Sequence, residues 1–157
     1  MRRREWVRYI EDKYALTLAH RRCDLALDEL FATQSEIETI KYDLVRYEAF
    51  RAGEPILTYK GRFGGCYIVD GHTRARVRWD IGDKTTPAIL LTSSNLDICA
   101  ELNRIAVEVG GGREQHIWDV PVTDRVGKGT EAWQARRAEL LAEWHAELEQ
   151  ADRELDY

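Results

Sequence analysis

The apolar positions of this chain follow a helical spacing near both ends and a strand-like spacing between them. Near the start, Trp6, Ile10 and Tyr14 predict an amphipathic helix over residues 4–19. Near the end, apolar positions at helical spacing predict a long amphipathic helix over residues 130–157, capped by Thr130. Aromatic and aliphatic residues at this spacing form a core face or a dimer face. The stripe on the second helix consists of Trp133, Arg137, Leu140, Trp144 and Leu148.

The middle of the chain contains short runs that are typical of strands. Gly61 and Gly65 bound a glycine-rich turn between two of these runs, as in a β-hairpin. The continuous apolar character of residues 86–91 indicates a buried strand. The expected strands and extended segments cover residues 23–27, 55–59, 66–69, 86–91 and 117–122.

Helical patterns fill the intervals between these runs. The first follows a turn at residues 31–35, where Thr33 or Ser35 can cap it, and stops near Gly53. Further helices are expected over residues 73–81 and 95–109. Alternating strands and helices that include a hairpin predict an α+β fold with a mixed sheet, packed helices and an additional amphipathic helix at each end.

Composition restricts the class of protein. A chain of 157 residues with 44% hydrophobic and 32% charged residues is typical of one globular domain. The net charge of −5 argues against a general nucleic-acid partner. No apolar stretch reaches the roughly 20 residues that span a bilayer, and acidic and basic residues interrupt the first turns, so neither a membrane segment nor a signal peptide is expected. Three widely spaced cysteines indicate reduced thiols, and we expect a cytoplasmic protein.

The segment Ile68–Arg76 carries the most chemistry. A β-branched run ends in Asp-Gly, and a helical pattern follows at once. A helix that starts directly after a strand exposes backbone N–H groups, here expected from Thr73, Arg74 and Ala75, together with the positive end of the helix dipole. This arrangement suits a phosphate. The alternative is a turn glycine before a solvated helix start.

The side chains of this turn add donors, a cation and an acid. The Thr73 hydroxyl and the Arg74 guanidinium can bind phosphate oxygens, and His72 can donate to a phosphate or carry a proton. Asp70 repels a bare phosphate, so we expect it to hold Mg²⁺, to orient His72 or to accept a proton from a substrate hydroxyl.

These residues lie in a wider pattern of strand pair, turn, short helix and apolar strand. The pattern is Pro55-Ile56-Leu57, Tyr67-Ile68-Val69-Asp70-Gly71-His72-Thr73-Arg74, Ile81-Gly82 and Pro87-Ala88-Ile89-Leu90. It resembles the ParB/sulfiredoxin superfamily over about residues 23–91, most closely the branch of free L-serine kinases. The resemblance implies a ParB/sulfiredoxin-like core over residues 20–125 of a single domain, followed by the C-terminal helix.

The resemblance also implies roles for the turn. Gly71, His72, Thr73 and Arg74 match the positions that bind the phosphates of a nucleotide, which implies ATP or ADP as a cofactor. Asp70 matches an acid beside the substrate and its Mg²⁺ ion.

A second segment matches the one that supplies the general base in the serine kinases. Thr33 and Gln34 fall on that segment. The base there is a glutamate, and Gln34 cannot accept a proton. Glu36 and Glu38 lie close by, and either can replace the base or simply favour the start of the following helix.

These observations lead to three hypotheses. The first is a nucleotide-dependent phosphotransferase acting on free serine or a similar small hydroxyl compound, in which Asp70, His72 or Glu36 is the base. The second is a ParB-like module that binds or cleaves DNA, which the resemblance to the superfamily and the basic run Arg2–Arg4 support. The third is a non-catalytic nucleotide sensor. The polar segment 110–125 can close over a substrate through His116 or Arg125, and the C-terminal helix can form a homodimer.

Overall fold

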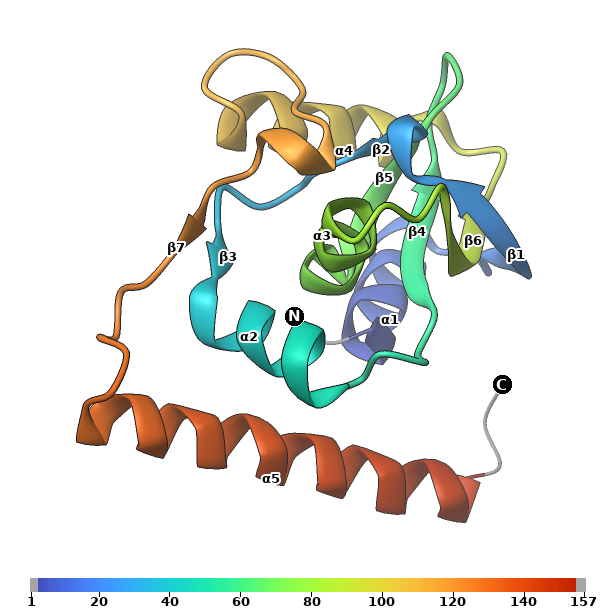
Figure 1. Ribbon diagram of the computed structural model, residues 1–157. Coiled ribbons are helices and arrows are strands. Elements are labelled where there is room, and N and C mark those ends of the chain that lie inside the picture. The colour runs from blue at the N-terminus through green and yellow to red at the C-terminus, as the bar shows by residue number, and fades with distance from the viewer. Residues whose placement is uncertain (1–2, 155–157) are drawn as a thin grey trace.

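In the part of the chain that the structure describes, five helices surround a mixed five-stranded sheet (Figure 1). The structure is a computed structural model that describes the backbone of residues 3–154 and the side chains of residues 5–150. The helices are α1 (Arg3–Tyr14), α2 (Thr39–Glu48), α3 (His72–Asp80), α4 (Leu96–Val109) and α5 (Glu131–Glu154), with the short turns η1 (Leu27–Glu29) and η2 (Ile117–Asp119). The strands are β1 (Ala19–Ala26), β2 (Leu30–Phe31), β3 (Ile37–Glu38), β4 (Ile56–Lys60), β5 (Cys66–Asp70), β6 (Thr85–Thr92) and β7 (Val122–Thr123).

The main sheet has the strand order β1-β6-β4-β5-β2. Strands β4 and β5 form the predicted antiparallel hairpin, and β6 lies parallel to β4 on its other side. Strand β1 runs antiparallel to β6, and β2 runs parallel to β5. A separate parallel pair joins β3 to β7. The predicted α+β class with a mixed sheet is therefore confirmed.

Alternation along the strands divides the core into two halves. On β4, Ile56 belongs to a buried cluster with residues of α2, α3 and α5, whereas Leu57 and Tyr59 belong to a second cluster with residues of α1 and α4. Because neighbouring side chains of a strand point to opposite faces, each face needs its own helical cover. The result is a sheet between two helical layers, with α3 packed on the same face as α2 (Figure 1).

Helix α5 uses most of its apolar stripe inside this chain. Trp133 and Leu140 are buried, and the ring of Trp144 contacts Phe50 edge-on at 5.1 Å between ring centroids. The Thr130 hydroxyl accepts the N–H of Trp133 at 3.2 Å, which is the predicted cap. The stripe is thus mainly a core face, and a dimer through this helix stays a prediction.

Several predicted boundaries are wrong. Helix α1 ends at Tyr14, because Ala15 adopts a left-handed backbone with φ 51°. Strand β1 begins at Ala19, four residues before the predicted start, because its polar first half pairs with β6. Helix α2 ends at Glu48, since Ala49 is left-handed with φ 55°.

The predicted cap of α2 is also wrong. Neither Thr33 nor Ser35 caps this helix: its N-cap is Glu38, which makes no side-chain cap, and Ile37 and Glu38 first pair with β7. The side chains of Arg2–Arg4 and residues 155–157 of the predicted last helix lie outside the described residues. Within those residues, no helix combines the length and the apolar character needed to cross a membrane.

Candidate functional site

The predicted strand–glycine–helix junction is present. Strand β5 ends at Asp70, Gly71 is the N-cap of α3 with φ 104°, and the helix begins at His72. The N–H of Ala75 donates to the Gly71 carbonyl at 3.0 Å, so Ala75 does not belong to the exposed donors, contrary to the prediction. By helix geometry the first N–H groups of a helix have no acceptor within it, and in α3 these include the N–H groups of His72 and Thr73.

Gly71 is required by its conformation and by its neighbours. A Cβ at this position would lie 2.6 Å from Cγ2 of Ile56 and 2.9 Å from Nη2 of Arg74. Ile56 is fully buried on the central strand β4 and has little room to shift. The glycine therefore lets the start of α3 lie directly against the sheet.

His72 faces inward and fixes the segment that precedes β3. Its side chain is buried, and its Nε2 accepts the backbone N–H of Thr33 at 2.9 Å. An accepting Nε2 places the hydrogen of the neutral ring on Nδ1. The pKa of His72 is lowered to about 4, chiefly by burial; the positive charges of Arg74 and Lys41 act in the same direction, and the negative charge of Asp70 opposes them. His72 is therefore neutral near pH 7, and its Nε2, which accepts from Thr33, cannot at the same time donate to a phosphate.

Thr33 makes a second link to the same junction. Its Oγ1 donates to the carbonyl of Ile68 at 2.5 Å, inside β5. The two hydrogen bonds hold the segment around Gln34 against the start of α3. Thr33 and His72 are 39 positions apart in the sequence. The structure thus joins the two segments that the sequence analysis singled out.

Arg74 and Asp70 lie together at the end of the hairpin. The Arg74 side chain is buried, and its Nη2 donates to the Pro55 carbonyl at 3.3 Å. The same nitrogen lies 3.9 Å from Oδ2 of Asp70, whose side chain is 38% exposed. The guanidinium thus contacts the start of β4 and offsets the charge of Asp70, while the carboxylate keeps access to solvent.

Hydrogen bonds hold Gln34 and both candidates for a replacement base, Glu36 and Glu38. Glu38 accepts two bonds from Arg136, at 2.8 and 3.0 Å. The exposed Gln34 donates from Nε2 to the Glu36 carbonyl at 2.8 Å. Glu36 accepts two bonds from Arg125, at 2.7 and 2.9 Å, and this pairing lowers the pKa of its carboxyl. A carboxylate with a lowered pKa is a weaker base, so Glu36 would have to leave Arg125 before it could accept a proton efficiently.

The segment 110–125 packs on α3 through a stack of rings. Four rings follow one another with centroids 4.7, 4.3 and 4.4 Å apart. In this arrangement His116 lies between two aromatic rings, and Arg125 points to Glu36. The stack consists of Phe31, His116, Trp118 and Trp79.

Sequence reasoning missed Lys41 as a residue of this region. Lys41 lies on α2, its side chain is 41% exposed, and its charge contributes to the lowered pKa of His72. It also lies 3.7 Å from a carboxylate oxygen of Glu38. The packing of α2 on α3 brings this cation near the turn, and no local sequence motif predicts that position.

The donor set at the turn fits a metal only together with a phosphate ligand. Among the described residues, no group of three or more His, Cys, Asp or Glu side chains is arranged to hold a metal ion. Mg²⁺ commonly uses one or two protein carboxylates together with water and phosphate oxygens. The single exposed carboxylate of Asp70 fits that second pattern.

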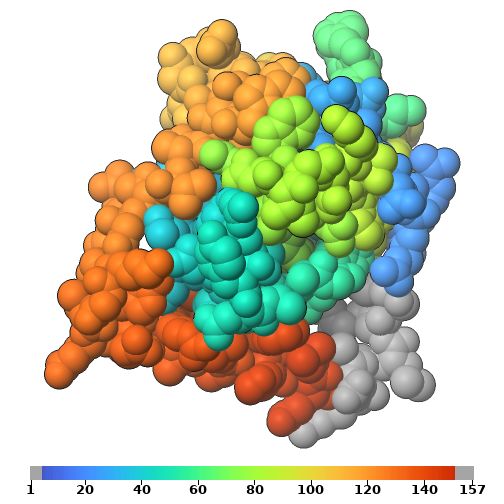
Figure 2. Space-filling view, viewed as in Figure 1, coloured from blue at the N-terminus to red at the C-terminus, as the bar shows by residue number. Residues whose placement is uncertain are grey.

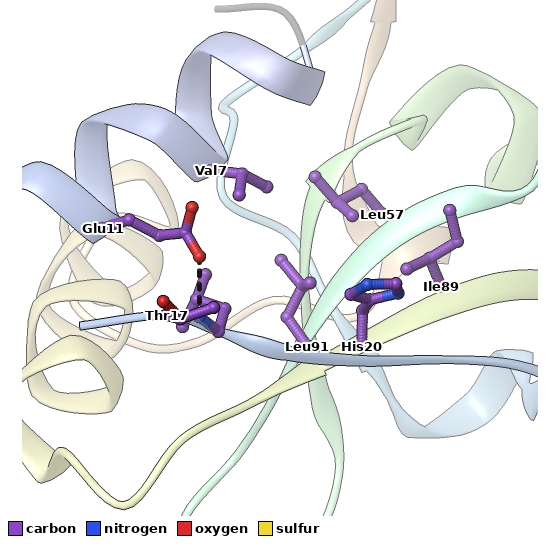
Figure 3. A pocket seen from close by; sticks show the side chains of 8 residues that line it. Val7, Glu11, Thr17, His20, Leu57, Ile89 and Leu91 are labelled. Carbon is purple, nitrogen blue, oxygen red and sulfur yellow. Dashed lines mark hydrogen bonds between the residues drawn. The ribbon is translucent and has the colours of Figure 1, made fainter. Parts of the chain in front are cut away.

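A separate small pocket lies on the opposite face of the sheet, under α1 (Figure 3). Its volume is about 170 Å³. The Glu11 carboxylate at its side accepts the backbone N–H of Leu18 at 2.8 Å, which is the bond drawn in Figure 3. The lining residues are Val7, Glu11, Thr17, Leu18, His20, Leu57, Ile89 and Leu91. None of them belongs to the turn.

Comparison with known proteins gives likenesses to solved structures only. No family model matches the chain, and no curated protein matches its sequence. Protein Atu1540 from Agrobacterium tumefaciens is similar with a TM-score of 0.43 and 16% identity, over 68% of this chain and 63% of that one. A Pnob8-like ParB-N domain is similar with a TM-score of 0.34 and 13% identity, over 88% of this chain and 51% of that one. This chain therefore spans less than two thirds of either structure, and membership of the ParB/sulfiredoxin superfamily stays a prediction from the motif.

Proposed function

We propose that the chain binds the phosphates of ATP or ADP at the start of α3 and transfers a phosphoryl group to free L-serine or a similar small hydroxyl compound. The observation that carries the proposal is the junction at Gly71, where α3 begins two residues after Asp70, whose carboxylate is accessible to solvent. The resemblance of the motif to the serine kinase branch supports the same choice.

The binding step relies on the backbone and on four side chains. The N–H groups of His72 and Thr73 and the Thr73 hydroxyl donate to phosphate oxygens. Lys41 adds a positive charge from α2. Arg74 reduces the repulsion between a phosphate and Asp70, since its Nη2 lies 3.9 Å from that carboxylate. Asp70, together with the phosphates, would hold Mg²⁺, which would neutralise negative charge that develops during transfer.

The transfer step needs a proton acceptor, and Asp70 is the best placed acid. Its side chain is 38% exposed and lies at the turn itself. Gln34 has no acid–base function, and Glu36 is paired with Arg125. A positioned base is worth about 10²–10⁴-fold in rate. Because Gln34 cannot act as a base and Glu36 is paired with Arg125, the site also favours a second candidate, a nucleotide sensor without turnover.

Thermal-shift measurements test the binding step. We expect ATP or ADP with Mg²⁺ to raise the unfolding midpoint. At 100 times the dissociation constant, the added stability is about 2.7 kcal/mol, a rise of roughly 5–10 °C for a chain of this size. Thr73→Val, which keeps the shape of the side chain, should reduce this rise. Equal midpoints with and without ADP, ATP and CTP would refute nucleotide binding.

A product assay tests the transfer step. Purified chain with Mg²⁺, L-serine and ATP or ADP should yield phosphoserine, detected by mass spectrometry. Asp70→Asn should lose at least about 100-fold of this activity, the low end for a base. The control Asp97→Asn changes an exposed acid in the first turn of α4 and should be neutral.

The outcomes separate the three hypotheses. If nucleotide raises the unfolding midpoint but no phosphoserine forms, the nucleotide sensor is the remaining hypothesis. Turnover gained by Gln34→Glu would then indicate a site that lost its base. DNA binding that weakens with salt, without a nucleotide shift, would favour the ParB-like DNA module.

A further inference from the structure

Strand β1 forms a long open edge of the main sheet. Its eight residues pair with β6 on one side, and among residues 3–154 no strand pairs with its other side. Figures 1 and 2 place β1 at one rim of the molecule. An edge strand of this kind presents a row of backbone N–H and C=O groups that can pair with another strand.

The two faces of β1 differ in charge. Arg22 and Asp24 lie opposite Ile89 and Pro87 of β6 and share one face of the sheet. Both are exposed. Cys23 points to the other face, where it packs at the margin of the buried cluster beneath α2 and α3. The exposed face of β1 thus carries a cation and an anion two positions apart.

The geometry of an antiparallel ladder leaves few ways to pair β1 with a second β1. In such a ladder, two opposite residues either both direct their backbone groups toward the partner strand or both direct them away. A twofold axis must therefore lie between two copies of the same residue, which we call an axis through that residue, and cannot relate a residue to its neighbour in sequence. An axis through Arg21 or Arg22 brings two guanidinium groups together. An axis through Asp24 brings two carboxylates together. Only the axis through Cys23, among these central positions, avoids like charges at the centre.

We propose that a second copy of this chain adds its β1 to β1, antiparallel, with the twofold axis through Cys23. In this register Arg22 of each copy lies opposite Asp24 of the other, which gives two ion pairs on one face. Opposite-charge pairs across strands are stabilising, and like charges directly opposite are destabilising. The two five-stranded sheets become one continuous sheet, and the open edge disappears.

A charge exchange tests the register. Sedimentation of the wild-type chain should show a dimer whose fraction rises with concentration. Arg22→Asp replaces each of the two ion pairs by a pair of opposed carboxylates, so we expect the dimer dissociation constant to rise by about tenfold or more. The double variant Arg22→Asp, Asp24→Arg should restore the wild-type value. The control Arg21→Asp makes the same change in net charge on the other face and should have a much smaller effect.

Cysteine crosslinking gives an independent readout. Directly opposite residues have Cα atoms about 4.5–5.5 Å apart, within the range of a disulfide. Cys23 is half-buried, whereas Cys66 and Cys99 are buried. Mild oxidation with copper phenanthroline, which removes the two thiol hydrogens and two electrons, should therefore give a covalent dimer that Cys23→Ser abolishes.

Three results would overturn the proposal. One is a chain that stays monomeric at all concentrations tested. Another is a charge exchange that fails to restore association when circular dichroism shows that the double variant is folded. The third is a dimer that Arg22→Asp leaves intact, which would assign association to another surface such as α5.

Discussion

Replacing Gly71 by alanine tests whether the start of α3 depends on a residue without a side chain. The residue has φ 104°, and the added Cβ would approach Cγ2 of Ile56 to 2.6 Å. Gly82, at the other end of α3, offers a matched control. It has φ 92°, and a Cβ there would meet no atom within 4 Å. The two substitutions share the backbone strain, and only the first adds a steric clash.

The magnitudes follow from these two effects. Forcing alanine into a left-handed conformation costs about 1–2 kcal/mol, and the lower entropy of the unfolded chain offsets part of this at both sites. Overlap with a packed core side chain costs about 1–3 kcal/mol more. Ile56 cannot move away from the added Cβ, because it is buried on a central strand. We therefore expect Gly71→Ala to be less stable than Gly82→Ala by about 1–3 kcal/mol.

Urea unfolding followed by far-ultraviolet circular dichroism measures this difference, since equal slopes allow the two free energies to be compared directly. The nucleotide-induced rise in the unfolding midpoint should also shrink in Gly71→Ala and persist in Gly82→Ala, because only the first variant displaces the N-terminal turn of α3. Equal free energies of unfolding for the two variants would refute the steric argument.

Three further predictions test the neighbourhood of the turn and the packing of α5. The pKa of His72 is about 4 in the folded chain against 6.5 for an ordinary histidine, so its contribution to stability is complete above pH 6.5 and falls as the pH drops toward 4. The free energy of unfolding of the wild type relative to His72→Gln should decrease by about 3 kcal/mol over that window, and a constant difference would contradict this. Leu140→Ala should cost about 2–5 kcal/mol in urea unfolding and Leu148→Ala, at a position 45% exposed, less than about 1 kcal/mol; similar losses would argue against the core role of α5. Arg125→Gln should raise the pKa of Glu36 in an NMR titration, because the bonds from Arg125 keep it low, and an unchanged value would contradict that pairing.

The elements with strong periodicity could be predicted from the sequence. The hairpin of β4 and β5, the buried strand β6 and the helices α3 and α4 lie close to their expected positions. The first half of β1 was missed because Ala19–Arg22 are polar or small, and their strand conformation comes from pairing with β6. A strand that is exposed at an edge needs no apolar alternation, so pattern alone does not reveal it.

The candidate site was found through its local motif, but its internal contacts depend on distant segments. The motif indicates donors and acids in order along the chain. It does not show that His72 binds Thr33, or that Arg74 binds Pro55, because these contacts join different elements. Thr33 was expected to cap a helix, as its position before an apolar run suggests. Instead it links two segments, because β3 intervenes before α2 begins.

These contacts change how the turn would recognise a ligand. In a free motif, His72 and Arg74 would be the strongest phosphate-binding side chains, yet both are buried and bonded inside the fold. A ligand at this place would therefore be held mainly by backbone N–H groups, with Thr73 and Lys41 at the surface. Backbone donors fixed by a glycine, a buried imidazole and a buried guanidinium need no reorganisation when a phosphate arrives. Under the proposed function, such a site would hold the phosphate in one place, and the chemistry would then depend on which acid, Asp70 or a released Glu36, reaches the substrate.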